Sequence, residues 1–177
     1  MNKKISLPLD EEKIRNLHIG DILFLSGKLF TARDKAHKKI LSIEKIPFNP
    51  KDMALFHCGP LMEKNKSGWK VISAGPTTSS RMEPFEADVI RKLGIRIIIG
   101  KGGMGEKTLK ALEKYSCVYL AYPGGAGALA ADKIEKVENV YWLEELGILE
   151  AVWIFKVKDF GPLVVAMDSH GETLYPK

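Results

Sequence analysis

Cysteine is scarce in this chain, which holds only Cys58 and Cys117 among 177 residues. Neither lies in a Cys-x-x-Cys pair, so the sequence indicates neither a disulfide framework nor a zinc knuckle. The string His57-Cys58-Gly59-Pro60 puts a histidine beside one cysteine, but zinc and iron–sulfur sites need three or four ligands that converge. We therefore predict no metal site on this chain alone, and we expect a reducing compartment.

Long hydrophobic runs are also missing. The longest apolar stretches, such as residues 95–99 and 163–167, are far shorter than the roughly 20 residues that a membrane-spanning helix needs. Residues 1–4 lead into no hydrophobic core of a signal peptide. The sequence therefore predicts a soluble, cytoplasmic protein with no membrane partner.

Charge of one sign does not dominate any long segment. The chain has 27 Lys and Arg against 22 Asp and Glu, which gives a formal net charge of +5. The densest basic runs, residues 35–39 and 64–70, are short and do not form a basic stripe interleaved with exposed aromatic residues. Because nucleic-acid surfaces combine such stripes with aromatics, we predict no nucleic-acid partner.

What the sequence does have is enough apolar residues for one folded domain. With 45% hydrophobic residues, a chain of this length buries roughly two-thirds of the surface that its unfolded form exposes. It contains no internal repeat, low-complexity segment or linker, so residues 1–177 are predicted to form one domain. Residues 1–19 are charged and are interpreted as an amino-terminal arm within it.

Strands and helices alternate along much of the chain. Short apolar runs predict strands at residues 22–25, 28–32, 54–57, 70–74, 95–99, 118–122, 140–142, 151–157 and 163–167. Helical periodicity predicts helices at residues 9–17, 33–44, 85–93 and 106–115, and a short one through residue 131. The alternation favours right-handed βαβ crossovers, and therefore an α/β domain with a mixed sheet.

Two turns complete this prediction. Residues 65–68 have turn chemistry and are expected to join residues 54–57 and 70–74 as an antiparallel pair. Gly161-Pro162 is expected to be the turn between the last two strands.

Two glycine loops each follow a predicted strand and precede a predicted helix. Residues 100–105 include Lys101, whose charge adds to the backbone N–H groups at a helix start and so favours an anion. Residues 123–127 carry no charge. Neither the Walker pattern nor the dinucleotide fingerprint is met. Both loops can also be tight turns in which glycine permits close packing.

A segment rich in hydroxyls follows the predicted strand at residues 70–74. It runs Gly75-Pro76-Thr77-Thr78-Ser79-Ser80-Arg81-Met82-Glu83. Ser80 and Glu83 match a capping box, which would assign them to the start of a helix. That interpretation leaves Thr77, Thr78 and Arg81 unexplained. An arginine fork matches a carboxylate, and a threonine hydroxyl can complete the lone pairs of the same anion.

A third polar cluster includes Arg33, Asp34 and His37. Arg33 and His37 are four residues apart, so they share one face if a helix begins here. His37 has a pKa class suited to proton transfer near neutral pH, although a surface or core role fits equally well. Asp34 could orient one of its neighbours or cap the helix.

Several strings together resemble the beta subunit, or carboxy-terminal domain, of class I fumarases and L-tartrate dehydratases. The resemblance extends from about residue 20 to residue 171. It depends on Arg33-Asp34-Lys35-Ala36-His37, His57-Cys58-Gly59-Pro60, Gly75-Pro76-Thr77-Thr78-Ser79-Ser80-Arg81-Met82, Gly100-Lys101-Gly102-Gly103-Met104 and Phe160-Gly161-Pro162.

The resemblance implies a single swivelling β/β/α domain that closes over an alpha subunit in a hetero-oligomer. In that family the alpha part holds a [4Fe–4S] cluster through three cysteines, which this chain lacks, so no cluster is expected on this chain alone. The matching positions imply that Arg33, Thr77, Arg81 and Lys101 bind a C4 dicarboxylate. His37, with Asp34 beside it, is the catalytic candidate on this chain, although the family places proton transfer on the alpha side.

The leading hypothesis from the sequence is therefore the reversible hydration of fumarate to (S)-malate by an alpha–beta assembly. An alternative within the same class is dehydration of L-tartrate, since both substrates are C4 dicarboxylates. An alternative from another class is a stand-alone dicarboxylate-binding module without catalysis.

Overall fold

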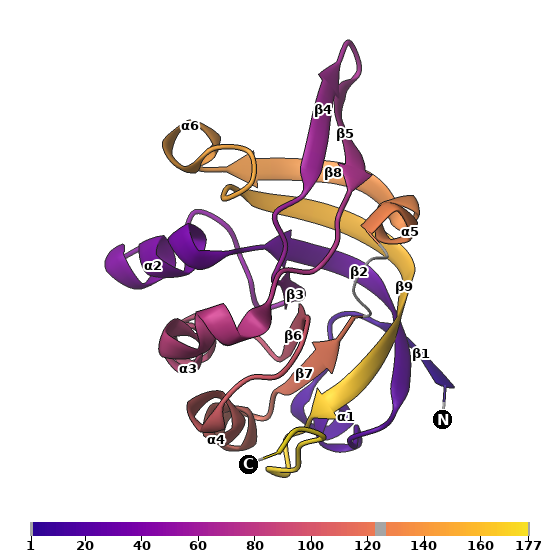
Figure 1. Cartoon of the computed structure of the whole chain (residues 1–177), viewed down its shortest axis with the longest axis vertical. Coiled ribbons are helices and arrows are strands. Elements are labelled where there is room, and N and C mark those ends of the chain that lie inside the picture. The colour runs from indigo at the N-terminus through magenta and orange to yellow at the C-terminus, as the bar shows by residue number, and fades with distance from the viewer. Residues whose placement is uncertain (1, 123–126, 177) are drawn as a thin grey trace.

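One seven-stranded sheet forms the centre of the molecule (Figure 1). The computed structural model describes residues 2–122 and 127–176. In spatial order the strands are β1 (Asn2–Ser6), β2 (Ile22–Thr31), β3 (Met53–Phe56), β6 (Ile97–Gly100), β7 (Val118–Ala121), β9 (Val152–Met167) and β8 (Ile134–Tyr141). A separate two-stranded sheet contains β4 (Leu61–Asn65) and β5 (Gly68–Ser73), which project from the body as a hairpin.

The large sheet closes into a five-stranded barrel because β9 pairs with strands on both sides. It is antiparallel to β2 and also to β7. Strands β2, β3, β6 and β7 are parallel neighbours, so the sheet is mixed. The register between β2 and β9 shifts on both sides of Leu25, and such irregularities let a strand curve around a barrel.

Three helices cover one side of the barrel and connect its parallel strands: α2 (Asp34–Ser42), α3 (Glu83–Leu93) and α4 (Glu106–Tyr115). Their apolar faces pack against Phe30 and Leu55 in one hydrophobic core. Leu29 and Phe56, the neighbours of these two residues along the chain, belong to a second core inside the barrel. The alternation follows from the two-residue period of a strand, which sends successive side chains to opposite faces.

The remaining helices are short: α1 (Glu11–Arg15), the 3-10 turn η1 (Ser79–Met82), α5 (Gly127–Asp132) and α6 (Leu143–Leu146). None of the helices in the described part of the chain is long and apolar enough to cross a membrane.

The predicted mixed α/β architecture is confirmed, and the helix expected at residues 106–115 has the same bounds as α4. The charged arm predicted at residues 1–19 contains a strand that was not predicted, because β1 pairs in parallel with β2. Of the second glycine loop, residues 123–126 lie outside the described residues.

Two details of the predicted strand arrangement were wrong. Residues 54–57 do not pair with residues 70–74, because β3 lies between β2 and β6 while the turn at residues 65–68 joins β4 to β5. Strand β4 was missed because it is mostly polar and exposed.

Gly161-Pro162 is not a turn either. It lies within the continuous strand β9, which curves through the register shifts opposite β2 instead of reversing direction. Likewise, the two extended segments predicted at residues 22–25 and 28–32 form the single strand β2.

Candidate functional site

The parallel strands β2, β3 and β6 end at the same edge of the barrel, and the predicted site residues gather there. Arg33 follows the end of β2 by two residues, and His57 and Lys101 come directly after β3 and β6. Because parallel neighbours point the same way, their carboxyl ends meet at one edge. In α/β sheets, both open and closed into barrels, this edge is where ligands bind.

The segment rich in hydroxyls crosses this edge between β3 and β6. The backbone N–H of Thr77 donates to the carbonyl of His57 over 2.7 Å. Farther on, the N–H of Ser79 donates to the carbonyl of Lys101 over 2.9 Å, and Thr78 forms a bridge with Lys101. Backbone hydrogen bonds therefore hold Thr77 beside the end of β3 and Ser79 beside Lys101, at the end of β6.

The two arginines of the site are each near a carboxylate of the same chain. Arg81 Nη2 donates to Asp34 Oδ2 over 2.7 Å. Arg33 Nε lies 3.8 Å from Glu150 Oε1. Arg33 also packs against Gly59, where an added Cβ would lie 2.5 Å from its Nη1 atom. Glycine at this position therefore leaves room for the guanidinium.

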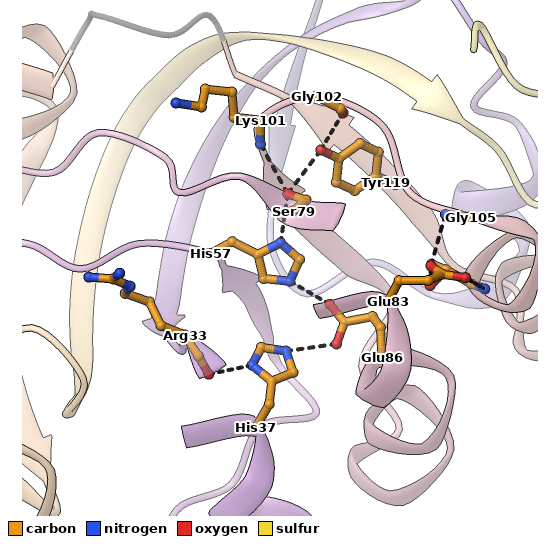
Figure 2. A network of polar contacts seen from close by, with 11 residues as sticks. Arg33, His37, His57, Ser79, Glu83, Glu86, Lys101, Gly102, Gly105 and Tyr119 are labelled. Carbon is orange, nitrogen blue, oxygen red and sulfur yellow. Dashed lines mark hydrogen bonds and ion pairs between the residues drawn. The ribbon is translucent and has the colours of Figure 1, made fainter. Parts of the chain in front are cut away.

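Two buried polar atoms at this edge lack a hydrogen-bond partner among the residues that the structure describes. They are Arg33 Nε, a donor, and Asp34 Oδ1, an acceptor. Buried polar groups are nearly always paired, so these atoms indicate a position where a polar ligand or water would bind. The side chains of Arg33 and Lys101 extend to the same side in Figure 2, and Lys101 is exposed.

Behind this edge, four buried side chains form a hydrogen-bonded chain (Figure 2). His37 Nδ1 lies 2.8 Å from the carbonyl of Arg33, and His37 Nε2 lies 2.8 Å from Glu86 Oε2. Glu86 Oε1 is 2.5 Å from His57 Nε2. His57 Nδ1 is 2.8 Å from Ser79 Oγ. We call His37, Glu86, His57 and Ser79 the buried network.

The hydrogen bonds of the buried network determine which ring nitrogens carry protons. A carbonyl only accepts, so His37 Nδ1 donates to Arg33, and an ionised Glu86 requires His37 Nε2 to donate as well. His37 is therefore an imidazolium. His57 donates to Glu86 from Nε2, and because burial lowers the pKa of this ring, its Nδ1 is unprotonated and accepts from the Ser79 hydroxyl. His57 is therefore neutral.

The pKa shifts agree with these charges. Burial lowers the pKa of His37, but the Glu86 carboxylate more than offsets this effect and raises the pKa above its ordinary value. Burial raises the pKa of Glu86, yet electrostatic attraction to the two histidine rings, His37 first, and the hydrogen bonds from both rings hold it well below its ordinary value. Burial keeps the pKa of His57 below its ordinary value. The network thus contains an ion pair between His37 and Glu86, next to the neutral ring of His57.

Ser79 connects the buried network to the glycine loop. Its Oγ accepts from the backbone N–H of Lys101 over 3.0 Å. It also lies 3.0 Å from the hydroxyl of Tyr119, which donates to the carbonyl of Gly102 over 2.7 Å. A Cβ at Gly100 would come within 1.7 Å of Ser79 Oγ. Close packing is therefore one reason for glycine at the start of this loop.

The predicted capping box at Ser80 and Glu83 was wrong. Helix α3 begins at Glu83 after Met82, without a side-chain cap in the described structure. The Glu83 carboxylate instead accepts from the N–H of Gly105 over 2.8 Å and from Thr108 Oγ1 over 2.6 Å. Glu83 therefore caps the following helix, α4.

The sequence did not single out Glu86, Ser79 or Tyr119, and it set His57 aside as a doubtful metal ligand. Glu86 lies on an amphipathic helix among charged residues, so nothing local distinguishes it from a solvent-exposed glutamate. The signal for His57 and Ser79 was their place inside two of the family strings. Their partners come from segments 22 to 49 residues away in the chain.

The cluster of His37, His57 and Glu86 has ligand types that suit a metal ion. However, zinc bound at about 2.0–2.2 Å would separate tetrahedral ligand atoms by roughly 3.3 Å. The nitrogen and oxygen atoms here are 2.5 and 2.8 Å apart, as expected for hydrogen bonds. The geometry therefore favours hydrogen bonds between these side chains over coordination of a metal ion.

Comparison with known proteins identifies the family. A family model described as "Fumarase C-terminus" matches residues 1–177. The L(+)-tartrate dehydratase subunit beta of Escherichia coli strain K12 is 39% identical over 175 residues, which cover 98% of this chain and 87% of that protein. A protein of Methanocaldococcus jannaschii, provisionally named L(+)-tartrate dehydratase subunit beta, is 48% identical over 171 residues, which cover 94% and 88%.

A third relative is a longer protein of Geobacillus stearothermophilus, provisionally named class I fumarate hydratase. It is 47% identical over 172 residues, which cover 97% of this chain but 33% of that protein. Because the family match covers the whole chain and these relatives align along nearly all of it, the chain belongs to the fumarase C-terminal family.

Proposed function

We propose that this chain is the beta subunit of a class I fumarase-type hydro-lyase and binds a C4 dicarboxylate substrate. The observation that carries the proposal is the cationic edge where Arg33, Arg81 and Lys101 follow or cross the ends of parallel strands. The unpartnered donor on Arg33 supports it. So does similarity to proteins named as beta subunits of L(+)-tartrate dehydratase.

The proposed roles follow from the chemistry of a diacid. Each of its two carboxylates is costly to bury unless it is paired with positive charge and hydrogen bonds. Arg33 and Arg81 offer planar forks for such pairing, and Lys101 offers a mobile point charge. Thr77 adds a hydroxyl next to the end of β3. In this proposal the four residues bind and orient the substrate.

L-Tartrate is the better-supported substrate. The sequence alone led to fumarate, with L-tartrate as the alternative, but two relatives aligned over most of both chains are named L(+)-tartrate dehydratase subunit beta. Fumarate is the second candidate, because a relative named class I fumarate hydratase matches over a third of its length.

The iron–sulfur cluster expected for this family does not fit this chain. Its two cysteines are both buried, and burial raises the pKa of each thiol, to about 12 for Cys117. Two protonated, buried thiols cannot supply three thiolate ligands. We therefore assign the cluster to an alpha partner and derive no reaction step through it.

The catalytic roles of His37 and Asp34 stay predictions. His37 has no exposed surface, and both its ring nitrogens are bonded within the protein. Among the described residues, the hydrogen bonds that lead from the Nε2 atom of His37 toward the site edge run through Glu86, His57 and Ser79. Asp34, which is partly exposed, holds the Arg81 fork. In the proposed function its direct effect is to orient that arginine.

The decisive experiment is reconstitution. The purified chain alone is expected to show no dehydratase activity, whereas anaerobic assembly with a partner that carries a three-cysteine iron–sulfur cluster restores it. Rates with L-tartrate, fumarate and (S)-malate then identify the substrate, with L-tartrate expected to be fastest. Turnover by this chain alone contradicts the subunit proposal. Diacid binding without any cluster-bearing partner supports a stand-alone binding module instead.

Substitutions at the cationic edge test the assigned residues. Losing a hydrogen bond to a charged group costs about 1.5–3 kcal/mol, so Arg81→Lys and Lys101→Met should each lower kcat/KM of the assembled enzyme about 10-fold to 100-fold. Arg91→Lys and Lys110→Met are matched controls, since both side chains form exposed ion pairs on helices. Unchanged kinetics in both edge variants refute the assignment.

A further inference from the structure

We propose that the buried network of His37, Glu86, His57 and Ser79 is a positioning device, which holds the backbone around Arg33, Thr77 and Lys101 in the arrangement that binds the dicarboxylate. The inference rests on the proposed function. It concerns residues that act through others and do not themselves touch the substrate.

Three of the four network residues are one hydrogen bond away from a proposed ligand residue, and the fourth, Glu86, joins the two histidines. His37 Nδ1 donates to the carbonyl of Arg33. The carbonyl of His57 accepts from the N–H of Thr77, and Ser79 Oγ accepts from the N–H of Lys101. Three segments that are distant in the chain are therefore connected to one set of residues, and Figure 2 shows the connections to Arg33 and Lys101. A shift of any member would move at least one of these segments.

Burial separates this role from direct catalysis. All four network side chains have 0% relative exposure. Every ring nitrogen of the two histidines and both carboxylate oxygens of Glu86 already have partners. A substrate at the exposed edge would contact Lys101 or Arg81, not these groups. The network can influence the substrate only through the backbone that it holds.

The surrounding chain leaves space for the network. Ser79 Oγ lies where a side chain on Gly100 would begin, because an added Cβ there would be 1.7 Å from Oγ and 2.9 Å from His57 Nδ1. Tyr119, from the next strand β7, shares its one hydroxyl proton between Ser79 Oγ and the carbonyl of Gly102. The glycine loop that carries Lys101 is thus held at three successive residues, 100 to 102.

Stability alone is a weak reason for such a network. Apolar residues of similar volume often stabilise a protein as well as a buried ion pair does, because desolvation of the charges offsets their attraction. Directional hydrogen bonds, by contrast, define one arrangement of the groups that they join. Here they join the backbone next to three proposed substrate ligands, which is the arrangement that a positioning role requires.

The test compares Ser79→Ala with Thr108→Val in the assembled enzyme. Each variant removes one buried hydroxyl. The hydroxyl of Ser79 bonds the N–H of Lys101 at the site edge, whereas that of Thr108 bonds Glu83. Ser79→Ala should raise KM for the dicarboxylate about tenfold, and Thr108→Val should leave it within about twofold. Tyr119→Phe, which keeps the ring, is the second network variant and should raise KM in the same direction. The Tyr119→Phe variant still tests the proposal if the Ser79→Ala chain does not assemble with its partner.

A double-mutant cycle separates positioning from general damage. If Ser79 acts through Lys101, the effects of Ser79→Ala and Lys101→Met on KM must be non-additive, because the second change removes what the first one positions. Additive effects, or an unchanged KM in both Ser79→Ala and Tyr119→Phe, overturn the proposal. A stoichiometric divalent metal that is lost on His57→Asn also overturns it. If Lys101→Met and Arg81→Lys are themselves silent, the proposed function fails instead.

Discussion

At the scale of single residues, the Asp34–Arg81 pair illustrates how the site differs from an ordinary surface ion pair. The side chains are 28% and 48% exposed, so the pair contributes little to stability. One carboxylate oxygen of Asp34 holds Arg81, while the other is buried without a partner in the described chain. The pair therefore has more significance for binding than for folding.

Asp34→Asn should separate these two effects. The free energy of unfolding of the chain should change by less than about 1 kcal/mol, as for other exposed pairs. Loss of the charge that orients the Arg81 fork should lower kcat/KM of the assembled enzyme about tenfold, the effect of about 1.4 kcal/mol. Urea unfolding and steady-state kinetics measure the two quantities. A large loss of stability with unchanged kinetics would show that Asp34 is structural.

His37 gives a prediction about pH. Facing it are the Glu86 carboxylate and the His57 ring from neighbouring elements, and Asp34 on its own helix. The pKa of His37 is raised in the folded chain, so its contribution to stability is fully present below about pH 6.5, the unfolded value. The contribution is lost as the pH rises through the folded pKa.

The variant His37→Asn should therefore be less stable than the unmodified chain by about 3–5 kcal/mol near pH 6, because Glu86 loses its charged partner. The difference should shrink as the pH is raised toward 9. Urea midpoints across this range measure it, with His18→Asn, at an exposed position, as the control. A difference that is independent of pH would mean that His37 is neutral in the folded chain.

At the scale of elements, Glu83 connects two helices of the layer outside the barrel. It is the first residue of α3, and its carboxylate receives hydrogen bonds from the start of α4 at Gly105 and Thr108. A carboxylate there also faces the positive end of the α4 dipole. The contact therefore links the starts of the two helices.

Glu83→Ala should lower the free energy of unfolding by about 1–2 kcal/mol, the usual cost of losing a helix cap. Glu106→Ala, which removes an exposed glutamate from the first turn of α4, should have a clearly smaller effect. Thermal or urea unfolding of the two variants tests the assignment. Equal losses in the free energy of unfolding would mean that Glu83 does not stabilise the start of α4 as a cap.

At the scale of the whole molecule, β9 closes the barrel, and Phe160 lies where it does so. This residue pairs with Leu25 of β2, is fully buried, and has ring contacts with Phe56 and Tyr122 inside the barrel. Phe160→Ala should therefore cost about 3–5 kcal/mol in the free energy of unfolding. Leu129→Ala, at a position 65% exposed, should stay within about 0.5 kcal/mol. Similar losses in the free energy of unfolding in both variants would contradict the assignment of Phe160 to barrel closure.

Prediction from sequence succeeded where the signal was local. The apolar period of residues 106–115 gave the bounds of α4, because a helix is formed by contacts within a few residues. The same reasoning failed at β9 and at the β4–β5 hairpin. Strand partners are far apart in the chain, and Gly161-Pro162 resembles a turn until its pairing with β2 is known.

The sequence by itself determined the alternation of strands and helices, the shortage of cysteine ligands, and the strings that place Arg33, Thr77, Arg81 and Lys101 in the segments after strands. Only the tertiary structure decided that these segments share one edge and that a buried network lies behind them. The physical reason is distance along the chain. Glu86 is 49 residues from His37 and 29 from His57, and the packing of α2 and α3 against the parallel strands brings them within hydrogen-bond reach.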